Sequence, residues 1–528
     1  METFTAAERA ALAPYFTDLD GPVFALVNLP EVVKGALFAR YSRSPKSLRR
    51  LFLDEFLESA QAGAAPPAVG TARADRLYER VFSEYGDDSV AQLGGVHLAC
   101  EGASNLLTKV LEWGRLMAYL EQSTRYIPYT DRPDGRWRYH VPAELQGHAL
   151  HSRYVETLDR AFETYARWIE PVKSHWESRL TRPPDAGETA WKSTVRAKAL
   201  DSLRGLLPAA TRSSVGIFGT GQGYEALLLR MRRHPLAEVR DYADRMLVEL
   251  RKVIPAFLQR VDRPDRGDVW SDYLDGARRE TAAVSARLLA GVEPEPRSEV
   301  TLTDFDPDGE IKVVAAALYA SSRLPDDQLL AIARKLEPEE RREVLAAYVG
   351  ARSNRRHKPG RAFERTSYRF DVLGDYGAFR DLQRHRLLTV EWQPLSTRHG
   401  WSASEEIEAV GALSDWRHVM DDSAGLYEAL VAAGLPEVAP YAVAMAYRMR
   451  YYMELNAREA MHLIELRTAP QGHPAYRRVG QAMHRLIATQ AGHRAIAAAM
   501  TFADLSDAEE GRLAAERAAE QRRTALGS

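Results

Sequence analysis

The chain repeats itself: short stretches from its first half return in the same order in its second half. The four matched pairs are residues 16–22 with 302–309, 37–45 with 318–325, 121–126 with 394–399, and 226–230 with 462–467. Each match is short, but four matches in one order indicate a tandem duplication. The separation between matched stretches shrinks along the chain, as expected if the second copy has shorter loops. A duplicated chain must fold into two related domains of ordinary size.

The join between the copies is predicted from composition. Residues 291–298 are polar and contain two prolines, which is typical of a linker. We therefore expect a degenerate N-terminal domain over residues 1–290 and a C-terminal domain over residues 299–528. A length of 528 residues is too great for one ordinary core, which agrees with this division.

Composition narrows the class of protein. Apolar residues make up 45% and charged residues 27%, which is typical of a water-soluble globular chain. The net charge of −2 provides no global field for nucleic acid or an anionic membrane, so we predict neither as a partner. The single cysteine, Cys100, excludes an intramolecular disulfide. No apolar run approaches the roughly 20 residues of a membrane span, and the first residues do not resemble a signal peptide. We expect a cytoplasmic location.

Apolar spacing of three to four residues predicts a mostly helical α+β chain with a small sheet in each copy. The predicted helices cover residues 46–60, 87–120, 150–180, 223–260, 326–350, 404–433 and 440–500. Cys100 would then lie in an apolar helix. Residues 137–141 and 300–303 are predicted strands. The tail from Asp504 to Ser528 is predicted to be a solvated helix that frays.

The strongest chemical motif is Arg384-His385-Arg386, followed after nine residues by Ser396 and then by Arg398. Guanidinium groups are fixed, always-charged donors that suit phosphates and the carbonyl edges of planar heterocycles. Such a cluster packs poorly in a core, because unpaired charge is expensive to bury. On its own the triplet would be interpreted as a solvated, salt-bridged helix end. Its context in the repeat favours a binding site.

The second copy resembles the flavin-dependent thymidylate synthases, the ThyX family, whose signature is Arg-His-Arg, seven residues, then Ser. Further similarity lies in Phe363-Glu364, in Leu435-Pro436 and in the stretch from Asn456 to Arg467. The resemblance covers residues 300–490 well and residues 15–255 more faintly. This copy departs from the family in three ways: two extra residues before Ser396, Pro394 in place of a glutamate, and Ala432 in place of an arginine.

The resemblance implies an enzyme that makes dTMP by passing a methylene group from methylenetetrahydrofolate to dUMP through FAD, with NADPH as reductant. Arginines would polarise the uracil carbonyls and neutralise the phosphate, and the flavin would need no cysteine nucleophile. The predicted cofactor contacts are Arg384, His385, Arg386, Glu364, Asn456 and His462. The predicted catalytic residues are Arg384, Arg386, Ser396 and Arg467.

The first copy has lost the opposite features. Its triplet is Trp113-Gly114-Arg115, but the family spacing to Ser123 is kept, and Arg204 stands before its Leu-Pro pair. The resemblance implies active sites that form between subunits. We therefore hypothesise an internal pseudo-dimer in which the two copies pool their remaining residues into one working site. Its predicted substrate contacts are Glu121, Gln122, Ser123, Thr124, Arg125, Arg204, Arg384, Arg398 and Arg467.

Several features allow two interpretations. Asn456 and Arg467 return to one helix face, so they form either a buried hydrogen-bonded pair or a ligand contact. His462 is either a flavin contact or a surface packing residue. The basic stretch 352–361 is either a solvated charge run or a cradle for the FAD pyrophosphate or the folate glutamates. Ser42 and Ser321-Ser322 either contact the flavin or terminate helices.

The histidines of the last third lack ligand spacing with carboxylates on one helix face, so no metal site is predicted. The leading interpretation is a flavin-dependent thymidylate synthase-like enzyme, expected to be a homodimer that mimics the family's tetramer. One alternative is a related flavoenzyme that modifies another pyrimidine nucleotide. The other is a non-catalytic paralogue that binds flavin or nucleotide, which Pro394 and Ala432 keep open.

Overall fold

The computed structural model describes residues 3–22, 24–41, 44, 46–57, 92–182, 184 and 187–506. The chain divides into two compact units. The first comprises Met1–Ala103, Val110–Glu121 and Ser213–Val292, and the second comprises Ser104–Lys109, Gln122–Arg212 and Glu293–Ser528. The middle of the first sequence half therefore folds together with the second half. The two copies predicted over residues 1–290 and 299–528 stay a prediction, because a division into compact units shows which residues pack together and not which segments arose by duplication. Ser42 and residues 507–528 of the predicted tail lie outside the described residues.

The first unit contains a three-stranded sheet in the order β1-β3-β2, formed by β1 (Gly95–Ser104), β2 (Met117–Glu121) and β3 (Arg212–Thr220). β2 pairs antiparallel with β3, so that Met117 faces Gly219 and Glu121 faces Val215. The helix predicted over 87–120 is therefore wrong: β1, α6 (Asn105–Leu111) and β2 occupy the described part of this range. Val96 and Cys100 are buried at a spacing of four, which looks helical in the sequence, but pairing within the sheet decides the conformation.

The helices of the first unit precede and follow this sheet. They are α1 (Ala6–Leu12), α2 (Glu31–Tyr41), α3 (Leu48–Glu55), α9 (Gly221–Met231), α10 (Ala237–Arg251), η6 (Pro255–Leu258) and α11 (Gly267–Leu288). The helix predicted over 223–260 is thus confirmed as two helices and a short turn. α9 begins directly after β3, and its buried face includes Tyr224, Leu227 and Leu228.

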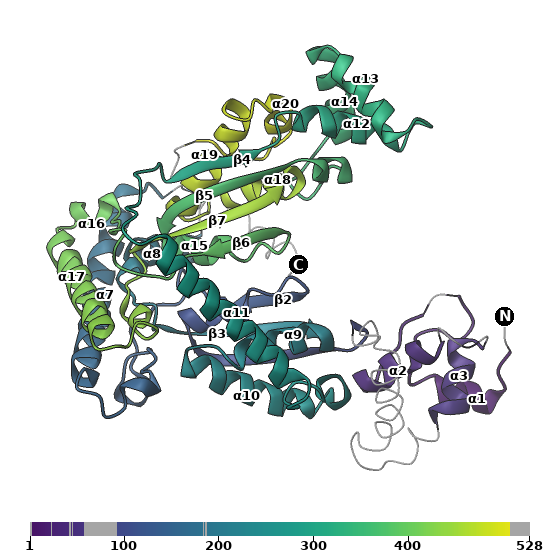
Figure 1. Ribbon diagram of the computed structural model, residues 1–528, viewed down its shortest axis with the longest axis horizontal. Helices are drawn as coiled ribbons and strands as arrows, with labels where there is room; N and C mark the ends of the chain where they lie inside the picture. The colour runs from purple at the N-terminus through teal and green to yellow at the C-terminus, as the bar shows by residue number, and fades with distance from the viewer. Residues whose placement is uncertain are drawn as a thin grey trace. The chain divides into compact units, whose positions relative to one another are not determined.

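The second unit is organised on a four-stranded antiparallel sheet in the order β4-β5-β7-β6 (Figure 1). Its strands are β4 (Val300–Phe305), β5 (Ser367–Asp375), β6 (Leu388–Trp392) and β7 (Arg448–Asn456). Met453 lies at the centre, opposite Phe370 on β5 and Val390 on β6. The strand predicted at 300–303 is confirmed. The helix predicted over 440–500 is wrong for residues 448–456, where buried and half-buried residues alternate with the period of two that defines a strand.

Helices α18 (Ala457–Arg467) and α19 (Pro474–Thr489) pack against this sheet. A second group joins the two halves of the sequence, because α7 (His151–Arg179) packs on α8 (Glu188–Leu203) and α17 (Leu413–Ala432). The remaining elements of this unit are α12 (Gly309–Tyr319), α13 (Asp326–Lys335), α14 (Pro338–Val349), α15 (Tyr376–Leu382), α16 (Glu405–Ala409), α20 (Arg494–Ala498), η3 (Pro133–Gly135), η4 (Ala143–Leu145), η5 (Arg204–Leu206), η7 (Arg361–Arg365) and η8 (Ala439–Ala442).

The predicted α+β class, mostly helical with small sheets, is confirmed. The strand predicted at 137–141 is reduced to a single bridge between Tyr139 and Thr211. Within the described part of the chain, no helix has the length and apolar character needed to cross a membrane.

Candidate functional site

Arg125 is the most firmly held of the predicted substrate contacts. Its Nε and Nη2 donate to the two carboxylate oxygens of Asp201 at 2.7 and 2.8 Å, and its Nη1 donates to the Tyr476 hydroxyl at 2.6 Å. Nη2 also donates to the Gln471 carbonyl at 3.1 Å. Burial lowers the pKa of Arg125, but Asp201 more than offsets this, and the group stays charged. Most of its five N–H donors bind other groups of the protein, so the main role that the structure shows for Arg125 is to hold its loop in place.

The residues around Arg125 differ in exposure. Thr124 is buried, Ser123 is half-buried and Gln122 is exposed. The Ser123 hydroxyl accepts a hydrogen bond from the Arg125 backbone N–H at 3.2 Å, which fixes the turn of the loop. Glu121 is the last residue of β2 in the first unit, so its place beside the substrate stays a prediction.

Arg204 follows α8 and is buried, with 3% of its surface exposed. Its Nη1 donates to Asp381 at 3.3 Å. Among the described residues its Nη2 has no hydrogen-bond partner. Gly377 lies directly against it, because a Cβ added there would come within 3.2 Å of the Arg204 Nε. The glycine makes room for a buried guanidinium that keeps one donor group available, which is costly unless a ligand or water meets it.

Asp381, near the C-terminal end of α15, is the point where the arginines converge. Its carboxylate lies 3.3 Å from Arg204 and 4.0 Å from Arg384. Burial raises the pKa of Asp381, yet the nearby guanidiniums hold it far below the ordinary range; in order of effect they belong to Arg384, Arg204, Arg467 and Arg125. The sequence analysis overlooked Asp381, although an acidic residue three positions before the Arg-His-Arg motif could have indicated a partner for these arginines.

The cluster is rich in cations. It contains four guanidiniums, from Arg125, Arg204, Arg384 and Arg467, and the carboxylates of Asp381 and Asp201 lie among them. The ring of Tyr476 lies close to two of the cations, with its centroid 5.5 Å from the Cζ of Arg125 and 5.5 Å from that of Arg467. Guanidiniums gathered in this way suit a phosphate group, which has a charge of about −1.5 to −2 at neutral pH.

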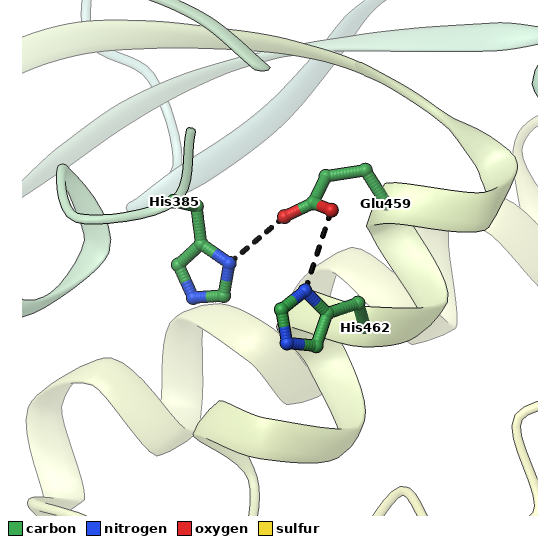
Figure 2. A group of neighbouring side chains, drawn as sticks. All are labelled: His385, Glu459 and His462. Atoms are coloured by element: carbon green, nitrogen blue, oxygen red, sulfur yellow. Dashed lines mark hydrogen bonds and ion pairs between the residues drawn. The ribbon is translucent and has the colours of Figure 1, made fainter. Parts of the chain in front are cut away.

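His385, the centre of the triplet, is buried and neutral. Its Nδ1 lies 2.9 Å from Glu459 Oε1 (Figure 2). Its Nε2 accepts a hydrogen bond from Arg467 Nε at 3.0 Å. An arginine can only donate, so Nε2 carries the lone pair and Nδ1 carries the proton. Burial lowers the pKa of His385 to about 4, with Glu459 acting in the opposite direction.

Glu459 is shared between two histidines (Figure 2). Its Oε2 lies 3.3 Å from His462 Nδ1, and the rings of His385 and His462 are 5.2 Å apart. Burial raises the pKa of Glu459, but the hydrogen bonds from both histidines outweigh this and lower it to about 2. The three ligand-type atoms lie within 4.8 Å of one another. The sequence analysis overlooked this group, although Glu459 and His462 stand three residues apart on α18.

The structure corrects the interpretation of Asn456. It ends β7 and caps α18, because its side-chain oxygen accepts a hydrogen bond from the Glu459 backbone N–H at 2.9 Å. Arg467 is the last residue of the same helix. The two residues are therefore not a polar pair on one helix face; the strand extends further than the apolar spacing suggests. Its role as a flavin contact stays a prediction.

Four other predicted residues differ in their partners and exposure. Glu364 forms ion pairs with Arg361 at 2.9 Å and Arg458 at 3.5 Å. Arg386 is exposed. Ser396 is buried on the stretch after β6 and accepts a weak hydrogen bond from the backbone N–H of the exposed Arg398 at 3.5 Å. Their roles stay predictions.

The basic stretch 352–361 has a buried anchor and an exposed surface. Arg352 forms a buried bidentate ion pair with Glu465, with both contacts at 2.6 Å, so it is structural. Arg458 on α18 donates to the Pro359 carbonyl at 2.9 Å and ties the stretch to the start of that helix. Burial lowers the pKa of Lys358 while Glu459 acts to raise it, so Lys358 lies within electrostatic range of the Glu459 group.

A cavity of about 410 Å³ adjoins the cluster, within the usual size range of small-molecule sites. Asp201 and Arg204 line it, together with Trp176, Trp416 and His473. Burial lowers the pKa of His473 to about 3, so this histidine adds no charge at neutral pH.

Comparison with known proteins identifies the family. Residues 36–256 and 301–491 each match the family described as thymidylate synthase complementing protein. The chain belongs to this family. The two-segment match agrees with the tandem duplication, and it leaves the predicted linker outside both segments.

Two relatives match along almost the whole chain. A UPF0159 protein of Chlamydia muridarum is 38% identical over 520 residues, covering 97% of this chain and 98% of that protein. A UPF0159 protein of Thermoplasma acidophilum is 30% identical over 518 residues, covering 92% and 97% respectively. A flavin-dependent thymidylate synthase of Clostridium tetani is 24% identical over 181 residues, which are 33% of this chain and 66% of that protein.

Proposed function

We propose that this protein is a flavin-dependent thymidylate synthase-like enzyme, which transfers a methylene group from methylenetetrahydrofolate to dUMP through FAD with NADPH as reductant. The observation that carries the proposal is the cluster of Arg125, Arg204, Arg384 and Arg467 in one compact unit. Two of these arginines come from the first sequence half and two from the second, as expected of copies that pool their remaining residues.

The arginine cluster would hold the nucleotide. Its four guanidiniums suit a phosphate monoester, and the Arg204 Nη2 supplies a buried donor for it. The planar guanidinium of Arg467 lies between His385 and the Tyr476 ring, where it could hydrogen-bond a uracil carbonyl without giving up a proton. These donors are fixed before the ligand arrives, which is the arrangement that stabilises developing negative charge most effectively.

The group around Glu459 would lie against the flavin. His462 is half-buried, and its Nε2 is on the side of the ring away from Glu459 (Figure 2). The exposed Lys358, which lies within electrostatic range of Glu459, provides a cation for a pyrophosphate. These residues fit a planar heterocycle with an anionic tail. When bound, FAD would supply the hydride and methylene chemistry.

The only thiol of the chain also supports a flavin route. Cys100 lies in β1 of the first unit, and burial raises its pKa to about 12. The thiolate needed for nucleophilic attack on a pyrimidine would therefore be scarce at neutral pH. A mechanism in which a protein cysteine activates the nucleotide is disfavoured by this environment.

The test is oxidation of NADPH by the purified protein in the presence of methylenetetrahydrofolate, with and without dUMP. We expect bound flavin visible by its absorbance, dUMP-dependent oxidation, and rescue of a thymidine auxotroph. Arg204→Ala should abolish turnover, while Arg485→Ala, whose side chain is exposed on α19 and has no predicted role, serves as the control. Absence of flavin from the purified protein, or oxidation indifferent to dUMP, would reject the proposal.

One observation favours a second candidate, a flavoenzyme acting on another pyrimidine nucleotide. The stretch 387–395 between the Arg-His-Arg triplet and Ser396 is two residues longer than in the family signature, so the residues beside a bound base would differ. Parallel assays with uracil and cytosine nucleotides, and with neutral deoxyuridine, would distinguish the two candidates. Binding without turnover of any of them would instead favour a non-catalytic paralogue. We also expect a homodimer, which the molecular mass in solution would test.

A further inference from the structure

Glu459, His385 and Arg467 form a continuous chain of hydrogen bonds. Glu459 Oε1 meets His385 Nδ1 at 2.9 Å, and Arg467 Nε meets His385 Nε2 at 3.0 Å. Glu459 and His385 are both buried. Arg467 also lies near the Tyr476 ring and within electrostatic range of Asp381, so it links these hydrogen bonds to the arginine cluster.

The direction of each hydrogen bond follows from the inventory of donors and acceptors. The guanidinium of Arg467 has no acceptor, so the bond exists only while His385 Nε2 keeps its lone pair. A neutral imidazole with a lone pair on Nε2 carries its proton on Nδ1, and this proton needs an acceptor in a buried site. Glu459 is that acceptor, and the cap from Asn456 to the Glu459 backbone fixes where its side chain begins.

We infer that Glu459 is a positioning residue for the anion site. It selects the tautomer of His385, and that tautomer holds the Arg467 guanidinium in the arginine cluster. The inference deepens the proposed function, on which it rests for the name of the ligand but not for the geometry. The ligand class is a phosphate monoester, and Glu459 acts on it only through His385 and Arg467.

A metal site is the competing interpretation of the same residues. His385, Glu459 and His462 offer two nitrogens and one oxygen, a ligand set that zinc accepts. A metal on His385 Nδ1 would move the ring proton to Nε2, where it would face the N–H of Arg467. The hydrogen bond at 3.0 Å would then be lost. The observed contact therefore favours the positioning role over metal binding.

The first test reads the tautomer directly in the full chain. Nitrogen-15 NMR of histidine-labelled protein, with His385 assigned by its disappearance in His385→Gln, should show a neutral ring protonated at Nδ1 at neutral pH. Zinc added in equimolar amount should leave this signal unchanged. A ring protonated at Nε2 would overturn the inference. So would zinc-induced shifts at His385 and His462 that are lost in Glu459→Ala, since these would establish a metal site.

The second test uses two matched pairs of variants and measures the dissociation constants of dUMP and of inorganic phosphate by calorimetry. His385→Gln places an amide oxygen near the position of the histidine Nε2, where it can still accept from Arg467. His385→Asn places its shorter amide only near the position of Nδ1. A glutamine at position 459 keeps the acceptor for the histidine, whereas an alanine removes it. We expect Glu459→Ala and His385→Asn to weaken binding at least about tenfold, and Glu459→Gln and His385→Gln to weaken it by less than about threefold.

The ordering of the variants is the decisive result. Equal losses within each pair, in step with losses in melting temperature, would show a purely structural role and overturn the inference. If the wild-type protein binds phosphate but not dUMP, the proposed function fails while the ordering with phosphate still decides the role of Glu459. If it binds neither, the anion site itself is rejected, and this inference falls with it.

Discussion

Two matched loops, one after β2 and one after β6, show how the duplicated copies have diverged. Each follows a strand of five residues that begins two residues after its triplet. Ser123 stands two residues after the end of β2, whereas Ser396 stands four residues after the end of β6. The extra residues of the second copy therefore lie between the strand and the serine. Arg125 is buried in an ion pair, while the matched Arg398 is exposed.

The strand and helix that follow later in each copy have the same lengths, unlike the loops. β3 and β7 both have nine residues, and α9 and α18, which follow them, both have eleven. The sequence match sets Gly219 opposite Asn456, but the residue that caps α9 as Asn456 caps α18 is Thr220.

The arginines near the ends of these helices have different partners. In the first copy the Cζ of Arg230 lies 5.0 Å from the ring centroid of Trp113, while in the second copy Arg467 bonds to His385. Both copies have kept the strand, the cap and the helix, because these rest on backbone pairing and a few local hydrogen bonds. That each copy has lost a different part of the site stays a prediction; a polar site depends on single side chains, so one substitution can remove it.

The largest expected effect is a difference in unfolding free energy between variants of the two loops. Arg125→Ala leaves Asp201 without its bidentate partner in a buried site and should lower the free energy of unfolding by about 3–5 kcal/mol. Arg398→Ala should change it by less than about 0.5 kcal/mol, since that side chain is exposed. Urea denaturation of both variants measures the difference. Equal effects would mean that the two loops have not diverged as described.

The second prediction concerns acid stability. The pKa of His385 is lowered from 6.5 to about 4, so the unfolded chain binds the proton more tightly than the folded chain. The contribution of this residue is therefore fully present above pH 6.5 and is lost as the pH falls toward 4, by up to about 3 kcal/mol. The difference in unfolding free energy between pH 7 and pH 4.5 should be smaller in His385→Gln than in the wild type. The first copy, with Gly114 at the matched position, has no such group.

The third prediction tests the space around Arg204. Gly377→Ala would place a methyl group 3.1 Å from Asp375 Oδ1 and 3.2 Å from Arg204 Nε. One or both of these side chains must then move, and we expect weaker dUMP binding by about tenfold. Gly374→Ala is the control, because its added carbon would meet nothing closer than 3.7 Å. Calorimetric titration of both variants measures the effect. Unchanged binding in Gly377→Ala would show that the position of Arg204 does not matter for the ligand.

The smallest expected effect compares the two helix caps. Thr220→Ala and Asn456→Ala should each lower the free energy of unfolding by about 1 kcal/mol, because each removes one N-cap hydrogen bond. Asn456→Ser should restore stability. If that variant is stable yet loses flavin, Asn456 is a cofactor contact as well as a cap; if it keeps flavin, Asn456 is only a cap.

Some errors of the sequence analysis had a visible cause. The alternation of Met449, Tyr451, Met453 and Leu455 marks β7 as a strand, but longer helical spacing on both sides obscured it. Residues 95–104 gave no such signal, because Val96 and Cys100 have the spacing of a helix and became a strand only through pairing with β3. Four of the predicted site arginines lie together around Asp381, and their role in binding stays a prediction. The acids Asp201, Asp381 and Glu459 were not among the candidates.

The sequence by itself determined the duplication and the family, since both are recorded in the order of residues along the chain, and it named the arginines as candidates for the site. Only the tertiary structure decided that residues 122–212 fold with the second half, which brings Arg125 and Arg204 to Asp381. It also decided which carboxylate meets each cation and which nitrogen of His385 carries the proton. Such pairings join residues far apart in the chain. They are selected because a buried charge is costly unless an opposite charge or a hydrogen-bond partner meets it, which no local pattern records.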